Sequence, residues 1–371
     1  KHSLASQSPG KHSLASQSPG KHSLASQSPG KHSLPSDGKK TALITGVTGQ
    51  DGSYLAEFLL KKGYRVAGLV RQTSNLAYAN ISHIQHDLDL IQADLLDPVC
   101  LREAIQKVKP NEVYNLASQS HPSESFRQPI HTAEITGIGA HRVLDATYDV
   151  NPKTKFYQAS SSEMYGWVRE IPQNEDTPFN PANPYAAAKL YAHSITRIYR
   201  ASYDMFACCG ILFNHESPRR HLGFVTQKVT YAAACAKLGV KNSEHLNEEG
   251  EPIVKGGKVA LGNLQAKRDW GFAGDYVEAM YLMMQLEKPD DFVIATGETH
   301  TIEELCKEAF DYIGLNWKDH VVVDKRFVRP TETGPLVGDA SKAKKILGWT
   351  PKTTFRQLVA LMVDAHLARL K

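Results

Sequence analysis

A short apolar segment that runs directly into a glycine-rich turn restricts the fold of this chain more than any other feature. Residues 41–45 (TALIT) are typical of a buried strand, and glycines follow at Gly46, Gly49 and Gly52. Residues 53–62 then carry apolar side chains at helical spacing. Such glycines let a backbone approach a pyrophosphate, whose charge lies at the helix N-terminus, so the segment predicts a dinucleotide-binding turn. The spacing is GxxGxxG rather than GxGxxG, and a tight turn that binds nothing is the alternative.

Segments typical of strands and helices continue to alternate along the chain. The apolar spacing predicts strands at residues 65–70, 90–93, 112–116, 155–159, 208–213 and 291–295. It predicts helices at residues 99–108, 133–148, 184–203, 226–238, 274–285, 302–313, 341–347 and 355–370. Apolar strands that alternate with helices form parallel sheets covered on both faces, so we expect an α/β fold with a Rossmann-like doubly wound parallel sheet.

The regular alternation breaks after residue 213, and a polar stretch at residues 241–258 predicts a surface loop. We therefore expect residues 39–213 and about 264–296 to form the dinucleotide-binding domain. Residues about 214–263 and 297–371 should form a smaller, discontinuous α/β substrate-binding domain.

A decamer repeat precedes this region. Residues 1–30 are three copies of KHSLASQSPG, and a fourth copy begins at residue 31. Each copy offers only Leu and Ala as apolar side chains, which cannot offset the entropy of ordering the chain. We expect residues 1–38 to be a disordered repeat tail, either natural or artificially added.

Charge and composition exclude several classes of protein. The first 34 residues hold four lysines and no acidic residue, so the net charge of +4 falls to zero without them. This leaves no electrostatic case for binding nucleic acid or a membrane. The apolar runs are shorter than the roughly 18 residues of a membrane span, and the first 40 residues lack the apolar core of a signal peptide. The five cysteines include no CxxC pair, so we expect a cytoplasmic protein without disulfides or a metal site.

Two further segments carry candidate catalytic groups. Tyr185 and Lys189 are four residues apart on a predicted helix and share one face, where the ammonium would lower the pKa of the phenol. Ser161 and Glu163 follow the strand predicted at 155–159, so a hydroxyl and a carboxylate would lie at its carboxyl end. Taken alone, the tyrosine and lysine also fit two surface positions, and Glu163 fits a helix cap. The order of glycine turn, serine and YxxxK favours a nicotinamide-dependent site.

The residue that ends the second predicted strand bears on the choice of cofactor. An acidic residue there would bind the ribose 2′-hydroxyl of NAD, whereas Arg71 can pair with the 2′-phosphate of NADP. We expect NADP, with NAD possible, and a solvated loop arginine is the alternative interpretation.

Longer motifs carry a resemblance to a known family. They are GVTGQDGSYLAEFLL from Gly46, FYQASSSEMYG from Phe156, GILFNHESPRR from Gly210, AKRDWG from Ala266, DFVIATGE from Asp291 and RPTE from Arg329. The chain from about residue 39 to 370 resembles the extended short-chain dehydrogenase/reductase superfamily. Within it, the chain is similar to the GDP-mannose 4,6-dehydratase family. The resemblance implies a hydro-lyase of nucleotide-sugar metabolism, on a route toward GDP-fucose.

The resemblance also implies roles for the four candidate catalytic residues. Tyr185 would take the 4-hydroxyl proton of GDP-mannose while hydride passes from C4 to NADP⁺. Glu163 would then remove H5 as water leaves across C5–C6, and hydride would return to C6 to give GDP-4-keto-6-deoxy-mannose. Ser161 matches a catalytic hydroxyl position of the family, and Lys189 would hold the nicotinamide ribose.

Binding positions follow from the same resemblance. The positions that match cofactor contacts are Gly46, Thr48, Gly49, Gln50, Asp51, Gly52, Arg71, Asp94, Leu95, Leu116, Ser118, Gln119, Ser120, Tyr185, Lys189, His215 and Arg220. The positions that match contacts to the sugar nucleotide are Ser120, Ser161, Glu163, Asn214, Arg268, Arg329 and Glu332. The two arginines of the second group suit a diphosphate, because guanidinium groups bind phosphate oxygens in pairs.

Departures from the family pattern keep alternatives open. Gln72 follows Arg71 where the family has a second arginine, residues 73–80 lack the family's loop sequence, and His131 replaces a tyrosine. Because that loop reaches a neighbouring subunit in relatives, its altered sequence weakens the case for a tetramer, and either a homodimer or a homotetramer is expected. The polar stretch at 241–258 is also longer than in typical members. Alternatives are the same reaction on another GDP-sugar such as GDP-manno-heptose, a superfamily 4-epimerase or reductase, and a catalytically silent nucleotide-binding regulator.

Overall fold

Seven parallel strands form the central sheet, in the order β12-β6-β5-β4-β1-β2-β3, in a computed structural model that describes residues 38–71, 78–328 and 334–371. The strands are β1 Thr41–Thr45, β2 Arg65–Val70, β3 Leu88–Gln92, β4 Glu112–Asn115, β5 Lys155–Ser161, β6 Ala207–Leu212 and β12 Phe292–Ile294. The direction of winding reverses between β1 and β4. In such sheets, ligands bind in the crevice at the carboxyl ends of the strands beside this reversal.

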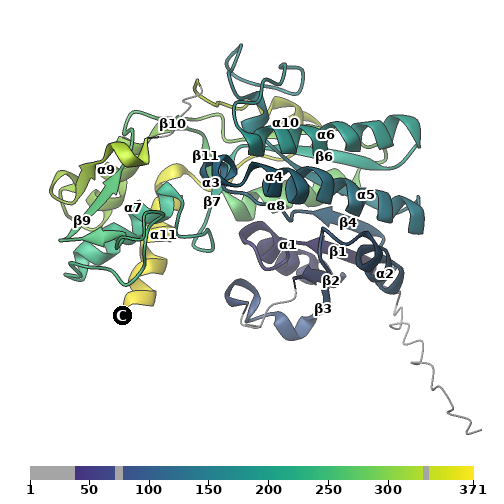
Figure 1. Cartoon of the computed structure of the whole chain (residues 1–371), viewed down its shortest axis with the longest axis horizontal. Helices are drawn as coiled ribbons and strands as arrows, with labels where there is room; N and C mark the ends of the chain where they lie inside the picture. Colours follow the sequence, from purple (N-terminus) through teal and green to yellow (C-terminus); the bar gives the residue numbers. More distant parts are fainter. Residues whose placement is uncertain (1–37, 72–77, 329–333) are drawn as a thin grey trace, which may run out of the picture. The chain divides into compact units, whose positions relative to one another are not determined.

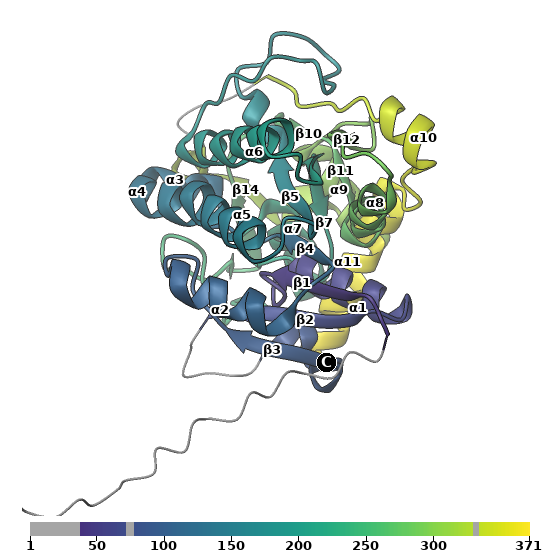
Figure 2. The same ribbon diagram turned by 90° about the vertical axis from the view of Figure 1, so that its right-hand side faces the viewer.

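Helices cover both faces of the sheet (Figure 2). One face packs against α1 Gln50–Lys61, α8 Ala273–Gln285 and α10 Ser341–Leu347. The other face packs against α2 Pro98–Val108, α5 Gly139–Val150 and α6 Pro184–Ser202. The α/β fold class and the doubly wound parallel sheet predicted from the sequence are therefore confirmed.

The turn between β1 and α1 depends on its glycines. Gly46 has a φ of +71°, and a Cβ there would lie 3.0 Å from the backbone of Ala117. A Cβ on Gly52 would lie 2.2 Å from the carbonyl oxygen of Gly46. The glycines allow the first turn of α1 to pack tightly on the end of β1, since a side chain at either position would collide with the backbone. The backbone N–H groups of this first turn then point toward a ligand that binds at the helix N-terminus.

A second group of elements has a hydrophobic core of its own (Figure 1). Its helices are α7 Val225–Lys237, α9 Ile302–Tyr312 and α11 Phe355–Leu370, and its sheet combines β8 Val254–Lys255, β9 Lys258–Leu261 and β14 Val321–Val323. Two small sheets pair β7 Asn214–Glu216 with β11 Trp270–Phe272, and β10 Lys267–Arg268 with β13 His300–Thr301. These elements come from separate stretches of the chain.

The remaining helical elements are short. They are α3 Pro122–Arg127, α4 Pro129–Thr132, a π-helical segment Ala133–Ile138 between α4 and α5, and the 3₁₀ turns Ala79–Ile81, Gln85–Asp87, Ser162–Tyr165, Trp317–Asp319 and Lys325–Phe327. None of the helices in the described ranges has the length and apolarity that a bilayer crossing requires.

Most predicted elements lie within a few residues of their observed bounds, and α10 and α11 have the predicted ones. Residues 133–148 are helical as expected, but the helical stretch begins earlier, at Pro129, and residues Ala133–Ile138 are π-helical rather than α-helical. The loop expected at 241–258 is wrong in part, since β8 lies within it. Sequence periodicity missed β7 to β11, β13 and β14, because two to four residues are too few to show alternation.

Three sets of predictions lie outside the described residues. They concern the repeat tail up to residue 37, the loop of residues 72–77 with Gln72, and the substrate positions Arg329 and Glu332.

Candidate active site

A pocket at the carboxyl ends of the central strands gathers many of the predicted site residues, and its lining continues to α7 and β9. The predicted residues in the lining are Asp51, Leu116, Ser118, Ser120, Ser161, Glu163, Tyr185, Lys189, Asn214, His215, Arg220 and Arg268. The other described candidates, which do not line it, are Gly46, Thr48, Gly49, Gln50, Gly52, Arg71, Asp94, Leu95 and Gln119. The structure thus brings the four catalytic candidates and several binding candidates together.

Asp51, in the first turn of α1, forms a partly buried ion pair with His215. Its Oδ2 lies 2.8 Å from Nε2 of His215 on β7. The Nδ1 of His215 lies 2.7 Å from the carbonyl oxygen of Phe213, so both ring nitrogens face acceptors and the doubly protonated imidazolium fits best. Burial would raise the pKa of Asp51, but His215 outweighs it and lowers that pKa to about 2. Burial likewise would lower the pKa of His215, and Asp51 raises it.

Gln50 reinforces the same connection. Its Nε2 donates to the carbonyl oxygen of His215 at 3.0 Å, and its Oε1 accepts from Ser217 Oγ at 2.8 Å. Two side chains predicted to contact a cofactor therefore connect α1 to β7 in this structure.

Tyr185 and Lys189 lie on α6 and are both buried. Burial raises the pKa of Tyr185 to about 12, despite a hydrogen bond with Ser161 that acts in the opposite direction. The Lys189 ammonium donates to the carbonyl oxygen of Ala159 at 2.7 Å, and burial lowers the pKa of Lys189 to about 8. The expectation that Lys189 brings the pKa of Tyr185 below its usual value is therefore wrong for this structure, because desolvation outweighs the favourable contacts of the phenol.

Ser161 and Glu163 lie at the end of β5 and in the 3₁₀ turn that follows. Ser161 Oγ accepts from the backbone N–H of Glu163 at 3.2 Å. The Oε2 of Glu163 accepts from Asn183 Nδ2 at 2.9 Å, while Asn183 Oδ1 accepts from the N–H of Ala186 at 2.8 Å and caps α6. Asn183 therefore holds the carboxylate beside the helix that carries Tyr185. We did not select Asn183 from the sequence, although an asparagine before Pro184 is a recognisable helix cap.

The wall predicted to face the cofactor is held by hydroxyl groups. Thr45 Oγ1 accepts from the N–H groups of Leu116 and Ala117, both at 3.0 Å. Thr136 Oγ1 lies 3.1 Å from Ser118 Oγ and accepts from the N–H of Gln119 at 3.1 Å. Thr136 belongs to the π-helical segment, a type of distortion that occurs often at functional sites.

The predicted residues near the second and third strands have different surroundings. Arg71 is exposed directly after β2, and Leu95 is buried. The carboxylate of Asp94 accepts from the N–H of Leu96 at 2.9 Å and stabilises the turn before α2. Of these three side chains, Arg71 is the exposed cation.

Three further binding candidates lie near β7 and β10: Asn214 and Arg268, predicted for the substrate, and Arg220, predicted for the cofactor. The Oδ1 of Asn214 is buried and has no hydrogen-bond partner among the described residues. The Nε of Arg220 lies 3.5 Å from Glu216, and its guanidinium lies 3.7 Å from the ring centroid of Phe224. Arg268 donates to the carbonyl oxygen of Lys267 at 2.7 Å. The buried amide oxygen of Asn214 can accept a hydrogen bond from a hydroxyl group of a ligand in the pocket.

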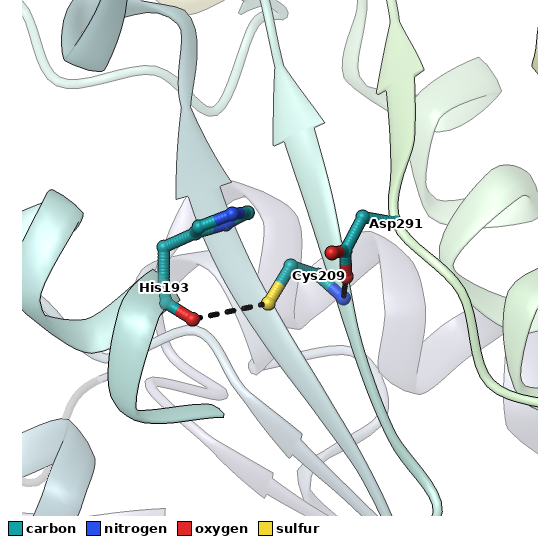
Figure 3. Close-up of side chains that lie close together, drawn as sticks. All are labelled: His193, Cys209 and Asp291. Atoms are coloured by element: carbon teal, nitrogen blue, oxygen red, sulfur yellow. Dashed lines mark hydrogen bonds between the residues drawn. The ribbon is translucent and has the colours of Figure 1, made fainter. Parts of the chain in front are cut away.

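His193, Cys209 and Asp291 form a buried group whose potential ligand atoms lie within 4.8 Å of one another (Figure 3). Both Asp291 oxygens already accept from the Arg200 guanidinium, at 2.8 and 2.7 Å, and Cys209 donates its N–H to the same carboxylate at 2.9 Å. Nδ1 of His193 lies 3.0 Å from Ser160 Oγ. A cation would have to displace the guanidinium, so the arrangement favours a structural network behind β5 and β6.

Three residues that we did not predict also line the pocket at its α7 side. They are Lys228 on α7, Glu248 in the polar stretch and Phe327 in a 3₁₀ turn. Each belongs to a different segment, and no short motif joins them, so only the tertiary structure could bring them together.

Comparisons with known proteins agree along almost the whole chain. The sequence model of the family described as GDP-mannose 4,6 dehydratase matches residues 43–362. GDP-mannose 4,6 dehydratase 2 of Arabidopsis thaliana is 52% identical over 345 residues, which cover 90% of this chain and 88% of the relative. The chain belongs to the GDP-mannose 4,6-dehydratase family. The Homo sapiens GDP-mannose 4,6 dehydratase is 46% identical over 360 residues and covers 90% and 93%.

Solved structures share the fold of this GDP-mannose 4,6-dehydratase family member. A Thermotoga maritima UDP-glucose 4-epimerase with UDP-glucose superposes with a TM-score of 0.77 at 22% identity, covering 89% of this chain and 100% of that one. A Bacillus anthracis dTDP-glucose 4,6-dehydratase in complex with NAD has a TM-score of 0.74 at 21% identity, covering 88% and 96%. RMD from Pseudomonas aeruginosa complexed with NADPH has a TM-score of 0.72 at 22% identity, covering 89% and 100%.

Proposed function

We propose that the protein converts GDP-mannose to GDP-4-keto-6-deoxy-mannose, with catalysis by Ser161, Glu163, Tyr185 and Lys189. The observation that carries this proposal is the carboxylate of Glu163. It is buried, it shares the pocket with Tyr185, and Asn183 fixes it beside α6. An elimination across C5–C6 needs such an acid–base group, whereas a 4-epimerase has no task for it.

We propose that the pocket and the adjoining β1–α1 turn bind a nicotinamide dinucleotide. The β1–α1 turn has no room for side chains at Gly46 and Gly52, and its helix N-terminus offers backbone N–H groups to a pyrophosphate. Arg71, exposed after β2, supports a preference for NADP over NAD, since a guanidinium can pair with the 2′-phosphate. When bound, the cofactor supplies the hydride acceptor for C4 and the hydride that later returns to C6.

In the first half of the reaction, Tyr185 takes the proton of the 4-hydroxyl and Ser161 holds the same oxygen through its hydroxyl. The pKa of Tyr185, near 12 in this structure, must fall for this step, so a positive charge has to approach the phenol. Lys189 is the residue that would deliver it, by exchanging its contact with Ala159 for one with the nicotinamide ribose.

In the second half, Glu163 takes H5, which the 4-ketone has made acidic. The same carboxyl group then gives that proton to the leaving 6-hydroxyl, so water departs and a C5–C6 double bond remains. After C6 has received hydride, C5 takes up one proton to complete the 4-keto-6-deoxy sugar. Tyr185 still holds the proton of the 4-hydroxyl at this point, so its phenol is the donor that balances the reaction.

The division of labour follows the two groups of elements. We propose that residues 39–213 and about 264–296 bind the dinucleotide, and that about 214–263 and 297–371 bind the sugar nucleotide through Asn214, Arg268, Arg329 and Glu332. The other positions that match cofactor contacts of the family, which run from Thr48 to Arg220 along the chain, would contact the cofactor here. We also propose a homodimer or homotetramer in the cytoplasm.

Incubation of the protein with GDP-mannose and NADP⁺ tests this function. The expected product is lighter than the substrate by one water and carries a 4-ketone, which mass spectrometry and carbonyl trapping detect. Parallel reactions with GDP-manno-heptose and UDP-glucose test the alternatives. If only GDP-manno-heptose is turned over, it is the substrate in place of GDP-mannose. Epimerisation without loss of water would overturn the dehydratase mechanism.

A further inference from the structure

The α7 side of the pocket contains an ion pair that the proposed reaction does not use. Nζ of Lys228 donates to Oε2 of Glu248 at 2.5 Å. The Lys228 side chain is 8% exposed, while that of Glu248 is 37% exposed. The ring centroid of Phe327 lies 5.2 Å from the same ammonium. A carboxylate, an ammonium and an aromatic ring therefore meet where the lining is formed by the second group of elements.

Glu248 is held in place by a built turn, although it belongs to the stretch that the sequence presented as a loop. Asn247 Oδ1 accepts from the N–H groups of Glu249 and Glu251, both at 3.0 Å, and the N–H of Gly250 donates to the carbonyl oxygen of Asn247 at 3.0 Å. Leu246 and Pro252 form an antiparallel bridge across the base of this turn.

The turn is also anchored to α7, the helix that carries Lys228. The ring centroids of His245 and Tyr231 lie 5.6 Å apart, and Tyr231 is buried in the core of the second group of elements. Lys228 then fixes the direction of the carboxylate itself. One oxygen of Glu248 faces the ammonium, and the partial exposure of the side chain leaves the carboxylate able to accept further hydrogen bonds from a ligand.

We infer that Glu248 is a specificity-determining residue that recognises the guanine base of the substrate by accepting hydrogen bonds from N1–H and the 2-amino group. This inference rests on the proposed function. Among the common bases, guanine alone presents two adjacent N–H donors on its pairing edge, and a carboxylate offers the two matching acceptors. The ring of Phe327 supplies an aromatic surface beside the same ion pair, which suits a planar base.

Inosine diphosphate provides the probe, because its base keeps N1–H and lacks the 2-amino group. A site built to hydrogen-bond an N–H group rejects a ligand that lacks it, since the acceptor is then left without its partner. The loss of affinity on removal of the 2-amino group should therefore depend on the Glu248 carboxylate. It should be large in wild type and small in a variant without the carboxylate, as in a double-mutant cycle between protein and ligand.

Calorimetric titration of GDP and inosine diphosphate should be carried out on the wild-type protein, Glu248→Gln and Glu249→Gln. Wild type should bind GDP roughly 10-fold or more tighter than inosine diphosphate, and Glu248→Gln should reduce this ratio to about 3-fold or less. Glu249 lies next in the same turn and pairs with Arg127 outside the pocket lining, so its variant should keep the wild-type ratio. Glu248→Ala must also lower the ratio, with thermal melting as the check on folding.

The outcomes separate this inference from the proposed function. An unchanged ratio in Glu248→Gln, or an equal loss of affinity for both nucleotides, would overturn the role of Glu248 while wild-type turnover of GDP-mannose still stood. Failure of wild type to bind GDP or convert GDP-mannose would overturn both. A ratio lowered equally in Glu249→Gln would assign the effect to the charge of the turn and overturn the specific contact.

Discussion

The two ends of the pocket are built in different ways. At the catalytic end, Ser161, Glu163, Tyr185 and Lys189 are all buried and are carried by β5, the turn after it and α6. At the α7 end, Glu248 is exposed and lies in a turn of the polar stretch, and Phe327 is partly buried and lies in a 3₁₀ turn. The catalytic groups thus lie on the central sheet and the helix that packs on it, whereas two of the three α7-side groups lie on connecting segments.

This difference indicates which part of the enzyme can change without loss of chemistry. A buried group on a packed element keeps its position when neighbouring loops vary, because core packing fixes it. A group on a surface turn can be replaced at little cost to stability. We therefore expect variants at the catalytic end to alter rate constants and variants at the α7 end to alter the choice of ligand.

The largest effect should come from Tyr185→Phe. Without the phenol, the first hydride transfer has no base, so turnover should fall toward the upper end of the roughly 10²–10⁴-fold range of general acid–base catalysis. No reduced cofactor should appear in absorbance measurements during a single turnover. Tyr191→Phe, an exposed position on the same helix, is the control and should retain activity. Normal reduction of the cofactor by Tyr185→Phe would assign the base elsewhere.

A loss of about 10²-fold or more is expected for Glu163→Gln, but at a different step. Glutamine keeps the size of the side chain and cannot accept the proton, so C4 should still be oxidised while water loss stops. Reduced cofactor should accumulate, and exchange of substrate H5 in D₂O should cease. Exchange at the wild-type rate would show that another residue removes H5.

Arg71→Ala should weaken binding of NADP⁺ by about 10- to 100-fold, because a charge-assisted contact contributes roughly 1.5–3 kcal/mol. Binding of NAD⁺ should change little, and fluorescence titration of both cofactors measures the contrast. Arg102→Ala, an exposed arginine paired with Asp149, serves as the control. If Arg71→Ala weakens the binding of NADP⁺ and NAD⁺ equally, Arg71 does not pair with the 2′-phosphate.

A moderate, pH-dependent effect is expected for the ion pair that joins α1 to β7. The depressed pKa of Asp51, about 2 against 3.8, contributes stability above pH 4 that is lost as the pH falls toward 2. The raised pKa of His215 contributes stability below its usual value near 6.5 that is lost as the pH rises through the raised one.

Asp51→Asn should therefore lower the free energy of unfolding by about 2 kcal/mol, most strongly between roughly pH 4 and 6.5. Urea unfolding across this range measures the difference. Asp311→Asn, which removes an exposed pair with Lys307, should show no comparable dependence. A difference that does not vary with pH would mean that the pair is not ionised as described.

The smallest effect should follow deletion of residues 1–36. These residues are polar and repetitive, so neither the melting temperature nor the kinetics at either end of the pocket should change. Differential scanning calorimetry and steady-state assays are the measurements. A clear loss in either would show that the repeats contact the folded region.

The sequence predicted the central sheet well because its strands are continuous apolar runs, and because amphipathic helices repeat their period between them. Tyr185 and Lys189 were also accessible, since their spacing alone places them on one face of a helix. The raised pKa of Tyr185 was not, because burial depends on tertiary packing. Lys228, Glu248 and Phe327 lie up to about a hundred residues apart in the sequence, and no local pattern connects them.

The side-chain amide of Asn183 links the residue proposed for C5–C6 elimination, Glu163, to the helix that carries Tyr185, the residue proposed for C4 oxidation. Its oxygen caps the helix that begins one residue before Tyr185, and its nitrogen binds the carboxylate of Glu163. If α6 shifts as a rigid body when ligands bind, the groups assigned to C4 and to C5–C6 must travel as one unit, so their spacing is conserved along the sugar ring. Oxidation at C4 and elimination across C5–C6 would then use one fixed distance between Tyr185 and Glu163. A sugar of different length or substitution could be accommodated only by a shift of the ligand, because these two side chains would not separate.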